Sequence, residues 1–355
     1  MKKLAIDIMF LHDQYYRRGI GRYGKEIASR IVELSNRDIE IHLIGFEDLE
    51  SNLAKLEMRI EPNLNNLVFH SLGSAKDASP ITNIVLCFTK LAPLLLRLRP
   101  DRYYTAHFDR LAPTMFVQTF ITIHDLIPFV TGSFSRQGKL KNFLKGLYYK
   151  FALSRALKSK VIYTDSKYSR KDLLKFGAKP DQIKVIYLGI TEEFFAESDS
   201  DILERLSLEP MSYLVYDSGH EENKNTKKLV DLLALLNQRG IGMKLVVTGG
   251  DFKFDSEALI ARTPNGQGFV DYAKEKGVLE QIRSTGTATE DELIRLFQKS
   301  KAYVNFSKYE GFGLGILQAM AAKTPAIISH YSTYPEVAGE AAILIDPENL
   351  EQHIT

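Results

Sequence analysis

Short apolar runs alternate along the chain with longer segments in which apolar residues recur every three or four positions. In the first 190 residues the apolar runs predict buried strands at 4–10, 39–44, 67–70, 120–123, 161–164 and 184–187. The longer segments predict helices at 24–34, 84–96, 139–157 and 169–176. Strands that alternate with helices indicate a parallel sheet with helices on both faces.

The second half of the chain repeats this alternation. It predicts strands at 213–216, 244–248, 282–284, 302–306, 326–328 and 342–345, and helices at 226–237, 269–276, 290–298 and 314–322. We therefore expect an α/β protein of two Rossmann-like domains, 1–190 and 211–355, joined by the polar, acidic linker 191–210. Because ligands of open α/β sheets bind at the carboxyl ends of the strands, the two parallel sheets should face each other across a shared cleft.

The composition is that of an ordinary globular protein, with 45% hydrophobic and 25% charged residues. The single cysteine, Cys87, excludes a disulfide within the chain and a thiolate metal cluster. The longest apolar stretch, 81–96, is interrupted by Lys90 and Pro93 and is too short to span a bilayer. No signal peptide is visible, so we expect a cytoplasmic protein.

The net charge of +2 hides an uneven distribution. Residues 1–190 carry a net charge of +12 and the remaining residues −10, and no acid lies between Asp125 and Asp165. Within that interval, 136–160 combines eight basic residues with apolar residues at helical spacing, among them Leu147, Tyr148 and Phe151. Such a helix could lie on an anionic membrane surface, could pack inward with a solvated basic face, or could do both. No nucleic-acid-binding module accompanies the basic segment, so a nucleic-acid partner is not expected.

A carboxylate followed by a glycine turn and a helix marks the second half. Glu310 enters the turn Gly311-Phe312-Gly313, and an apolar helical pattern begins at Leu314. A turn between a strand and a helix presents free amides and the positive end of the helix, which favour an anion such as phosphate. An acid beside a phosphate site suits the hydroxyl groups of an attached sugar. This combination suggests a nucleotide sugar.

Other candidate residues are open to two interpretations each. Residues 19–24 formally match the dinucleotide fingerprint, with Glu47 as the ribose acid, but they do not directly follow the first strand. A loop in which Gly21 allows a ligand close to the backbone fits better, and a simple turn before a helix remains the alternative. His124 ends a predicted strand and is either a functional side chain or a satisfied capping residue. Lys224 could meet a diphosphate as a point charge or could be a solvated lysine at a helix start. No histidine or cysteine spacing predicts a metal site.

Taken together, these segments resemble the family 4 glycosyltransferases, which are retaining enzymes of the GT-B fold. The resemblance covers nearly the whole chain and rests on motifs at 19–23, 123–126, 164–169, 185–189, 224–225, 310–314 and 332–339. Each motif is weak alone, and their order and spacing together are specific.

The resemblance implies a role for each motif residue. Gly21 would lie beside the donor diphosphate, His124 would line the site near the reacting sugar, and Lys224 would neutralise the phosphates. Glu310 matches the first acid of the E-x7-E pair, which contacts the hydroxyl groups of the donor sugar. The amides around Phe312, Gly313 and Leu314 would hold the sugar and phosphates. Gln318 stands at the second acid, the ribose-binding position.

Several positions depart from the family pattern. Gln318 carries no charge, although it can still accept a hydrogen bond. Asn223 replaces a basic residue, Gly315 replaces a proline that presets a helical φ, and Lys323 replaces a glycine. The family continues beyond Thr355 with further helices, so the chain is expected to be a truncated or naturally shortened form.

The sequence predicts a metal-independent retaining glycosyltransferase that moves a sugar from a nucleotide-diphosphate sugar to a hydroxyl acceptor. No cofactor is expected beyond this substrate. The acceptor should be a glycan or a lipid-linked sugar in cell-envelope polysaccharide or glycolipid synthesis. Such an acceptor agrees with a position on the inner face of the membrane. Two alternatives remain, a catalytically weakened GT-B subunit that supports another glycosyltransferase and a nucleotide-sugar epimerase.

Overall fold

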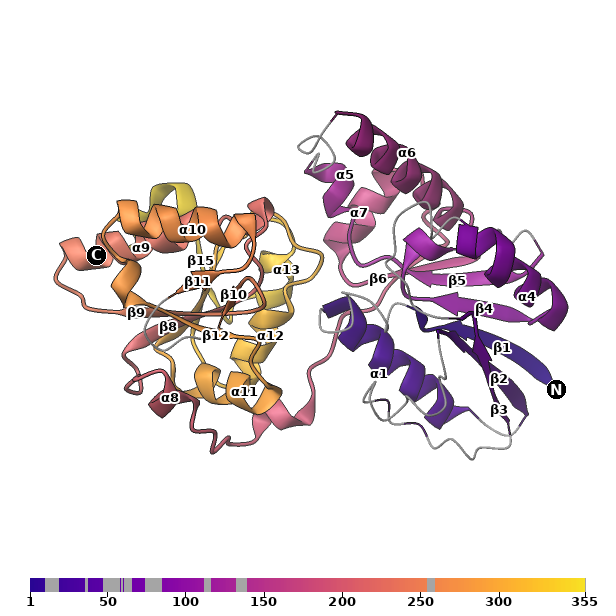
Figure 1. Ribbon diagram of the computed structural model, residues 1–355, viewed down its shortest axis with the longest axis horizontal. Helices are drawn as coiled ribbons and strands as arrows, with labels where there is room; N and C mark the ends of the chain where they lie inside the picture. Colours follow the sequence, from indigo (N-terminus) through magenta and orange to yellow (C-terminus); the bar gives the residue numbers. More distant parts are fainter. Residues whose placement is uncertain are drawn as a thin grey trace. The chain divides into compact units, whose positions relative to one another are not determined.

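The computed structural model describes residues 1–9, 19–35, 38–46, 58, 60, 66–73, 85–111, 116–131, 139–253 and 259–354. The chain divides into two compact units, Met1–Tyr187 (unit 1) and Leu188–Thr355 (unit 2). Each unit is built on its own parallel sheet with helices around it (Figure 1). Among the described helices, none is both long enough and apolar enough to cross a membrane.

The sheet of unit 1 has seven strands in the order β3-β2-β1-β4-β5-β6-β7, and neighbouring strands are parallel. The strands are β1 (Lys2–Asp7), β2 (Ile39–Gly45), β3 (Leu67–Ser71), β4 (Arg102–Thr105), β5 (Gln118–Thr122), β6 (Val161–Thr164) and β7 (Ile183–Val185). The predicted strands are present, with small differences at their ends. The pattern missed β4, a short strand whose buried Tyr103 and Tyr104 follow directly on a charged residue.

Helices cover both faces of this sheet. They are α1 (Gly19–Leu34), the π turn η2 (Cys87–Leu91) leading into α4 (Ala92–Leu98), η3 (Phe108–Arg110), α5 (Ile127–Val130), α6 (Lys139–Ala156) and α7 (Lys167–Lys175). Ala28 and Val32 of α1 pack on one face, against Ile6 and Leu43. The opposite face contacts α4, α6 and α7 (Figure 1).

The main sheet of unit 2 has the order β12-β9-β8-β13-β14-β15 and is also parallel. Its strands are β8 (Tyr213–Asp217), β9 (Lys244–Thr248), β12 (Ile282–Gly286), β13 (Ala302–Asn305), β14 (Ala326–Ser329) and β15 (Ile343–Ile345). Counted within the unit, this is the Rossmann order 3-2-1-4-5-6. The connections after β8 and β13 leave in opposite directions, so a crevice for ligands is expected where these two strands end.

Unit 2 also contains a short antiparallel hairpin, β10 (Phe252–Lys253) and β11 (Ile260–Ala261), which the sequence pattern did not predict. The helices are η5 (Glu192–Phe195), α8 (Ile202–Arg205), η6 (Glu222–Lys224), α9 (Lys227–Gln238), α10 (Pro264–Glu275), η7 (Leu279–Gln281), α11 (Glu290–Lys299), α12 (Leu314–Ala321), α13 (Tyr334–Ala338) and η8 (Pro347–His353). One core cluster lies under α11 and α12, and another lies under α9 and α10.

The segment 191–210, suggested by its polarity as a linker, packs on unit 2. Phe194, Ile202, Leu203 and Leu206 are buried in the same core cluster as Phe297 of α11. The Ser198 hydroxyl donates to the carbonyl of Asp291 over 3.0 Å. The segment is acidic on its surface and apolar beneath it, so it is an integral part of unit 2.

Candidate functional site

In unit 2, Lys224 and Glu310 come together at the ends of β8 and β13. Lys224 ends the short helix η6 that follows β8, and Glu310 lies in the loop between β13 and α12. The ammonium group of Lys224 donates to both carboxylate oxygens of Glu310, over 2.8 and 2.9 Å. Their side chains are only 16% and 12% exposed, so solvent screens this ion pair weakly.

Hydroxyl groups fix the carboxylate of Glu310 further. Ser307 Oγ donates to its Oε1 over 2.7 Å and Tyr334 Oη over 3.3 Å, while its main-chain amide donates to Ser332 Oγ over 2.9 Å. Burial first, and then the charge of Glu310, raise the pKa of Tyr334 well above its usual value. Tyr334 therefore remains a hydrogen-bond donor at neutral pH. Glu310 is held in one orientation as an acceptor.

The turn before α12 places backbone amides beside this pair. Gly313 caps the helix with φ +98°, a conformation that favours glycine, and a Cβ at this position would lie 2.7 Å from Cε1 of Tyr334. The Phe312 carbonyl is held by the Thr333 hydroxyl over 2.8 Å. No side chain of the described residues caps α12, so the amides of Leu314 and Gly315 are available to an anion.

One turn into α12, Gln318 is buried with 2% of its surface exposed. Among the described residues, no hydrogen bond involves its side-chain amide, and this amide is not one of the fully buried polar groups that lack a partner. An amide without a protein partner at the edge of a site bonds water or a ligand. Gln318 is thus suited to accept a hydrogen bond from a ligand hydroxyl.

In unit 1, His124 follows β5 and meets an acid that follows the neighbouring strand β6. Nδ1 of His124 lies 2.6 Å from Oδ2 of Asp165, and both side chains are almost fully buried. The ring of Tyr23 on α1 contacts the imidazole edge to face, with centroids 4.7 Å apart. The Ser169 hydroxyl donates to the His124 carbonyl over 3.0 Å. Asp165 and Tyr23 therefore hold the imidazole ring in one orientation, and Ser169 holds the backbone of His124.

Burial lowers the pKa of His124, but the charge and hydrogen bond of Asp165 oppose this effect. Asp125 adds a smaller effect in the same direction as Asp165, and the net result is a raised pKa. The carboxylate of Asp125 is used locally, since its Oδ1 accepts from the Ile127 amide over 2.9 Å and forms a turn before α5. Asp165, and not the adjacent Asp125, is therefore the hydrogen-bond partner of His124. Nε2 of His124 is buried and has no partner among the described residues, so it can bond a ligand.

Comparisons with known proteins identify the family. The model of glycosyl transferases group 1 matches residues 208–354, which contain Lys224, Glu310 and Gln318. O-antigen chain mannosyltransferase B of Escherichia coli is 23% identical over 95% of this chain and 85% of its own length. The GDP-mannose:cellobiosyl-diphosphopolyprenol alpha-mannosyltransferase of Komagataeibacter xylinus is 24% identical over 62% of this chain and 51% of its own length. The crystal structure of Anabaena HepE with UDP-glucose matches with a TM-score of 0.72 and 16% identity, over 99% of this chain and 88% of that one.

Residues 208–354 are a domain of the group 1 glycosyltransferases. The chain is a glycosyltransferase enzyme with the GT-B fold, and the predictions of family, fold and enzyme class are confirmed. The structure also explains positions at which this glycosyltransferase departs from the family pattern.

Asn223, at the place of a basic residue, connects two loops of the site. Its side-chain amide donates to the Tyr309 carbonyl over 3.0 Å, and its main-chain carbonyl accepts from the Lys308 main-chain amide over 2.7 Å. These bonds tie the loop that carries Lys224 to the loop that carries Glu310. A longer basic side chain could not make the hydrogen bond to the Tyr309 carbonyl. At a position where the family has a charged side chain, Asn223 of this glycosyltransferase therefore holds the two site loops together.

The local structure bears on two further departures from the family pattern, Gly315 and Lys323. A Cβ at Gly315 would lie 2.9 Å from Cζ of the buried Tyr303 and still closer to its hydroxyl, so a proline ring has no space. Lys323 has φ +59°, the left-handed conformation in which glycine is favoured. The lysine occupies it at a cost of about 1 kcal/mol.

Not every expectation for the site is met. The loop expected around Gly21 is wrong, because Gly21 lies buried in the first turn of α1, which begins five residues before the predicted start. Glu47 and the residues 10–18 before α1 lie outside the described part of the chain. Sequence reasoning assigned no role to Asp165, which lies in the motif at 164–169. Its position directly after the strand next to β5 was the available signal, since carboxyl ends of adjacent parallel strands meet at one edge.

Replacing Asp165 with asparagine should lower the pKa of His124, because the negative charge that holds the proton is lost. Since the folded pKa lies above the ordinary value, protonation of His124 contributes stability below about pH 6.5. This stability is lost as the pH rises through the folded pKa, and D165N should remove it. NMR titration of the His124 Cε1 proton measures the shift, with D125N as the control expected to shift it less. An unchanged pKa in D165N would contradict the pairing.

Proposed function

We propose that this glycosyltransferase transfers a sugar, with retention, from a nucleotide-diphosphate sugar to a hydroxyl group of a glycan or lipid-linked acceptor. The observation that carries the proposal is the buried Lys224–Glu310 pair beside the uncapped start of α12. Lys224 and the α12 amides supply positive charge for a leaving diphosphate, and Glu310 accepts from sugar hydroxyl groups. Charge placed in advance of reaction stabilises the transition state more than mobile solvent does.

Gln318 and His124 complete the assignment. Gln318 would accept from a ribose hydroxyl, and Nε2 of His124 would bond the transferred sugar. No cofactor is proposed beyond the sugar nucleotide. A weakened, non-catalytic subunit was suggested by Gln318 and Asn223. The local contacts of both residues support an active enzyme instead: Gln318 is an available acceptor, and Asn223 bridges two loops.

The donor we propose is a mannosyl group carried on GDP. The relatives in Escherichia coli and Komagataeibacter xylinus are mannosyltransferases by name, and the second is named for GDP-mannose. The acceptor would belong to cell-envelope polysaccharide, as the name O-antigen chain mannosyltransferase indicates for the first relative.

Thermal unfolding with GDP, UDP, ADP and dTDP and their sugar derivatives tests this donor. A ligand at 100 times its Kd stabilises the folded state by about 2.7 kcal/mol. We expect the largest rise in Tm with GDP and GDP-mannose. A preference for UDP would replace the proposed base, whereas no rise with any nucleotide would contradict the proposed function itself.

We also propose that α6 rests on an anionic membrane surface at the inner face of the cell membrane. Of the apolar residues at helical spacing in α6, Tyr148 is buried, whereas Leu147 and Phe151 are 57% and 43% exposed. Lys150 lies between them on the same exposed face. Apolar side chains beside a lysine suit the boundary between headgroups and acyl chains.

Substitution of Leu147 and Phe151 by serine should abolish flotation with vesicles that contain anionic lipid. Phe195 of unit 2, 65% exposed, provides a matched control, and F195S should float like the unchanged protein. Equal flotation with neutral and anionic vesicles would contradict the membrane proposal.

A further inference from the structure

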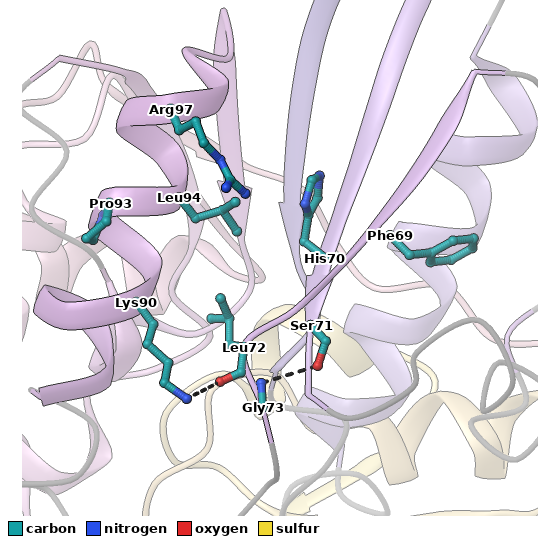
Figure 2. A pocket seen from close by; sticks show the side chains of 9 residues that line it. All are labelled: Phe69, His70, Ser71, Leu72, Gly73, Lys90, Pro93, Leu94 and Arg97. Atoms are coloured by element: carbon teal, nitrogen blue, oxygen red, sulfur yellow. Dashed lines mark hydrogen bonds between the residues drawn. The ribbon is translucent and has the colours of Figure 1, made fainter.

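A pocket in unit 1 lies away from His124, between the end of β3 and the helical segment η2–α4 (Figure 2). Its volume is about 610 Å³. Leu72 and Leu94 are buried at its base, and Lys90, Leu94 and Arg97 extend from the helical segment toward β3 (Figure 2). The pocket opens at the carboxyl edge of the sheet, the edge at which His124 also lies.

The described lining of this pocket contains two cations and no acid. The four helical lining residues have the spacing of one helix face: Lys90, Pro93, Leu94 and Arg97. Both cations therefore lie on the side of the helix that faces the pocket. Lys90 Nζ donates to the Leu72 carbonyl over 2.6 Å, which leaves two of its three donors. Arg97 makes no hydrogen bond or ion pair with any residue in the described ranges. The pocket therefore presents positive charge without an internal counter-charge.

The backbone of the pocket is adapted to this lysine. Gly73 has φ +99°, a conformation that favours glycine, and a Cβ there would lie 2.9 Å from Lys90 Nζ and displace the ammonium group. The Gly73 amide donates to Ser71 Oγ over 3.2 Å, which fixes the turn (Figure 2). Lys90 itself lies in the π turn η2, a rare conformation that is frequent at functional sites.

His70 adds a polar group that does not neutralise the pocket. Its Nε2 lies 2.9 Å from Nδ1 of the buried His42. Burial, the neighbouring His42 and Arg97 lower the pKa of His70, while the more distant Glu40 opposes them. A neutral imidazole here can share a proton with a bound anion without requiring a counter-ion.

We propose that this pocket binds a phosphate or diphosphate group of the acceptor. The inference rests on the proposed function, in which the acceptor lies on unit 1. The strand order separates β3 from β5 by four strand spacings, about 19 Å in all. An acceptor that reaches from the pocket to His124 must therefore be extended. Its phosphate lies at one end, and its reacting hydroxyl group lies at the other end, farther away than a single sugar ring can reach.

Titration of inorganic diphosphate by calorimetry tests the pocket in the full chain carrying Lys224→Ala, which disables the proposed donor-phosphate site. We expect one binding site, weakened about tenfold by each of Lys90→Gln and Arg97→Gln, because each removes a charge-assisted hydrogen bond. Arg99, exposed at the end of the same helix and absent from the lining, is the control, and Arg99→Gln should bind like the parent chain. No binding, or equal binding by all variants, overturns the proposal.

Two further measurements separate the pocket from the donor site and from lipid. Nucleotide-induced stabilisation of a chain that retains Lys224 should be unchanged by K90Q and R97Q. A failed donor proposal would remove the nucleotide effect but leave diphosphate binding intact. The phosphate could belong to an acceptor or to a phospholipid headgroup, so the same variants are floated with phosphatidylglycerol vesicles. Unchanged flotation of the two variants supports the acceptor, whereas lost flotation assigns the pocket to a lipid headgroup and overturns the acceptor proposal.

Discussion

Replacing Glu310 with alanine should lower sugar transfer by about 10²–10³-fold, the usual loss when one group of a prearranged polar site is removed. The substitution removes the acceptor for sugar hydroxyl groups and leaves Lys224 buried without its counter-ion. Because breaking such a pair leaves an uncompensated charge, the free energy of unfolding should also fall by about 2–3 kcal/mol. Steady-state kinetics with a saturating acceptor and urea unfolding measure the two effects.

Lys224→Ala is the reciprocal test of the same pair. It should raise the KM for the donor, because Lys224 binds the donor diphosphate in the ground state. It should also lower kcat, because the diphosphate gains negative charge as it leaves. Glu280→Ala, an exposed acid elsewhere in unit 2, is the control for loss of a carboxylate and should leave both constants unchanged. Transfer that survives both E310A and K224A would show that the site lies elsewhere.

Replacing Gly315 with alanine should lower the free energy of unfolding by about 2 kcal/mol, although alanine is the better helix former. The added Cβ meets the hydroxyl and ring of Tyr303, which is 1% exposed and cannot move into solvent. The Tyr303 hydroxyl also accepts from Asn305 Nδ2 over 2.9 Å, so the ring is held in place. At about 2–4 °C per kcal/mol, the loss is visible as a fall in Tm.

Gly268 provides the matched control for this prediction. It lies in α10, and a Cβ built on it meets nothing within 4 Å. Gly268→Ala should therefore raise the free energy of unfolding by about 1 kcal/mol, the helix-propensity difference alone. Equal effects of the two substitutions would mean that Tyr303 does not limit the space at Gly315.

The sequence predicted much of the fold because its signals are local. Long apolar runs such as 244–248 identified buried strands, and the glycine turn before Leu314 identified the start of α12. The apolar pattern did not predict the strand β4, because its apolar character comes from Tyr103 and Tyr104. Their hydroxyl groups count as polar as long as their hydrogen-bond partners are unknown. Thr122 is one such partner, 2.9 Å from the Tyr104 hydroxyl and distant along the chain.

The candidate site was predictable only in part, for the same reason. Lys224 and Glu310 were found through motifs, but their direct contact is formed between residues 86 positions apart. The partner of His124 is Asp165, 41 positions away, and no local pattern distinguishes it from the adjacent Asp125. The bridge made by Asn223 and the space taken by Tyr303 are likewise properties of packing. A residue that departs from a family pattern can therefore look like a lost function when it is a structural adaptation.

The contact between Gly315 and Tyr303 also imposes an order on evolutionary change. A lineage that acquires proline at position 315 before the tyrosine shrinks passes through an unstable protein, whereas the opposite order opens space first. Neither position contacts substrate through a side chain in our assignment, yet the two positions should change as a pair among descendants of this sequence. Selection on protein stability alone can thus preserve the unusual helix start.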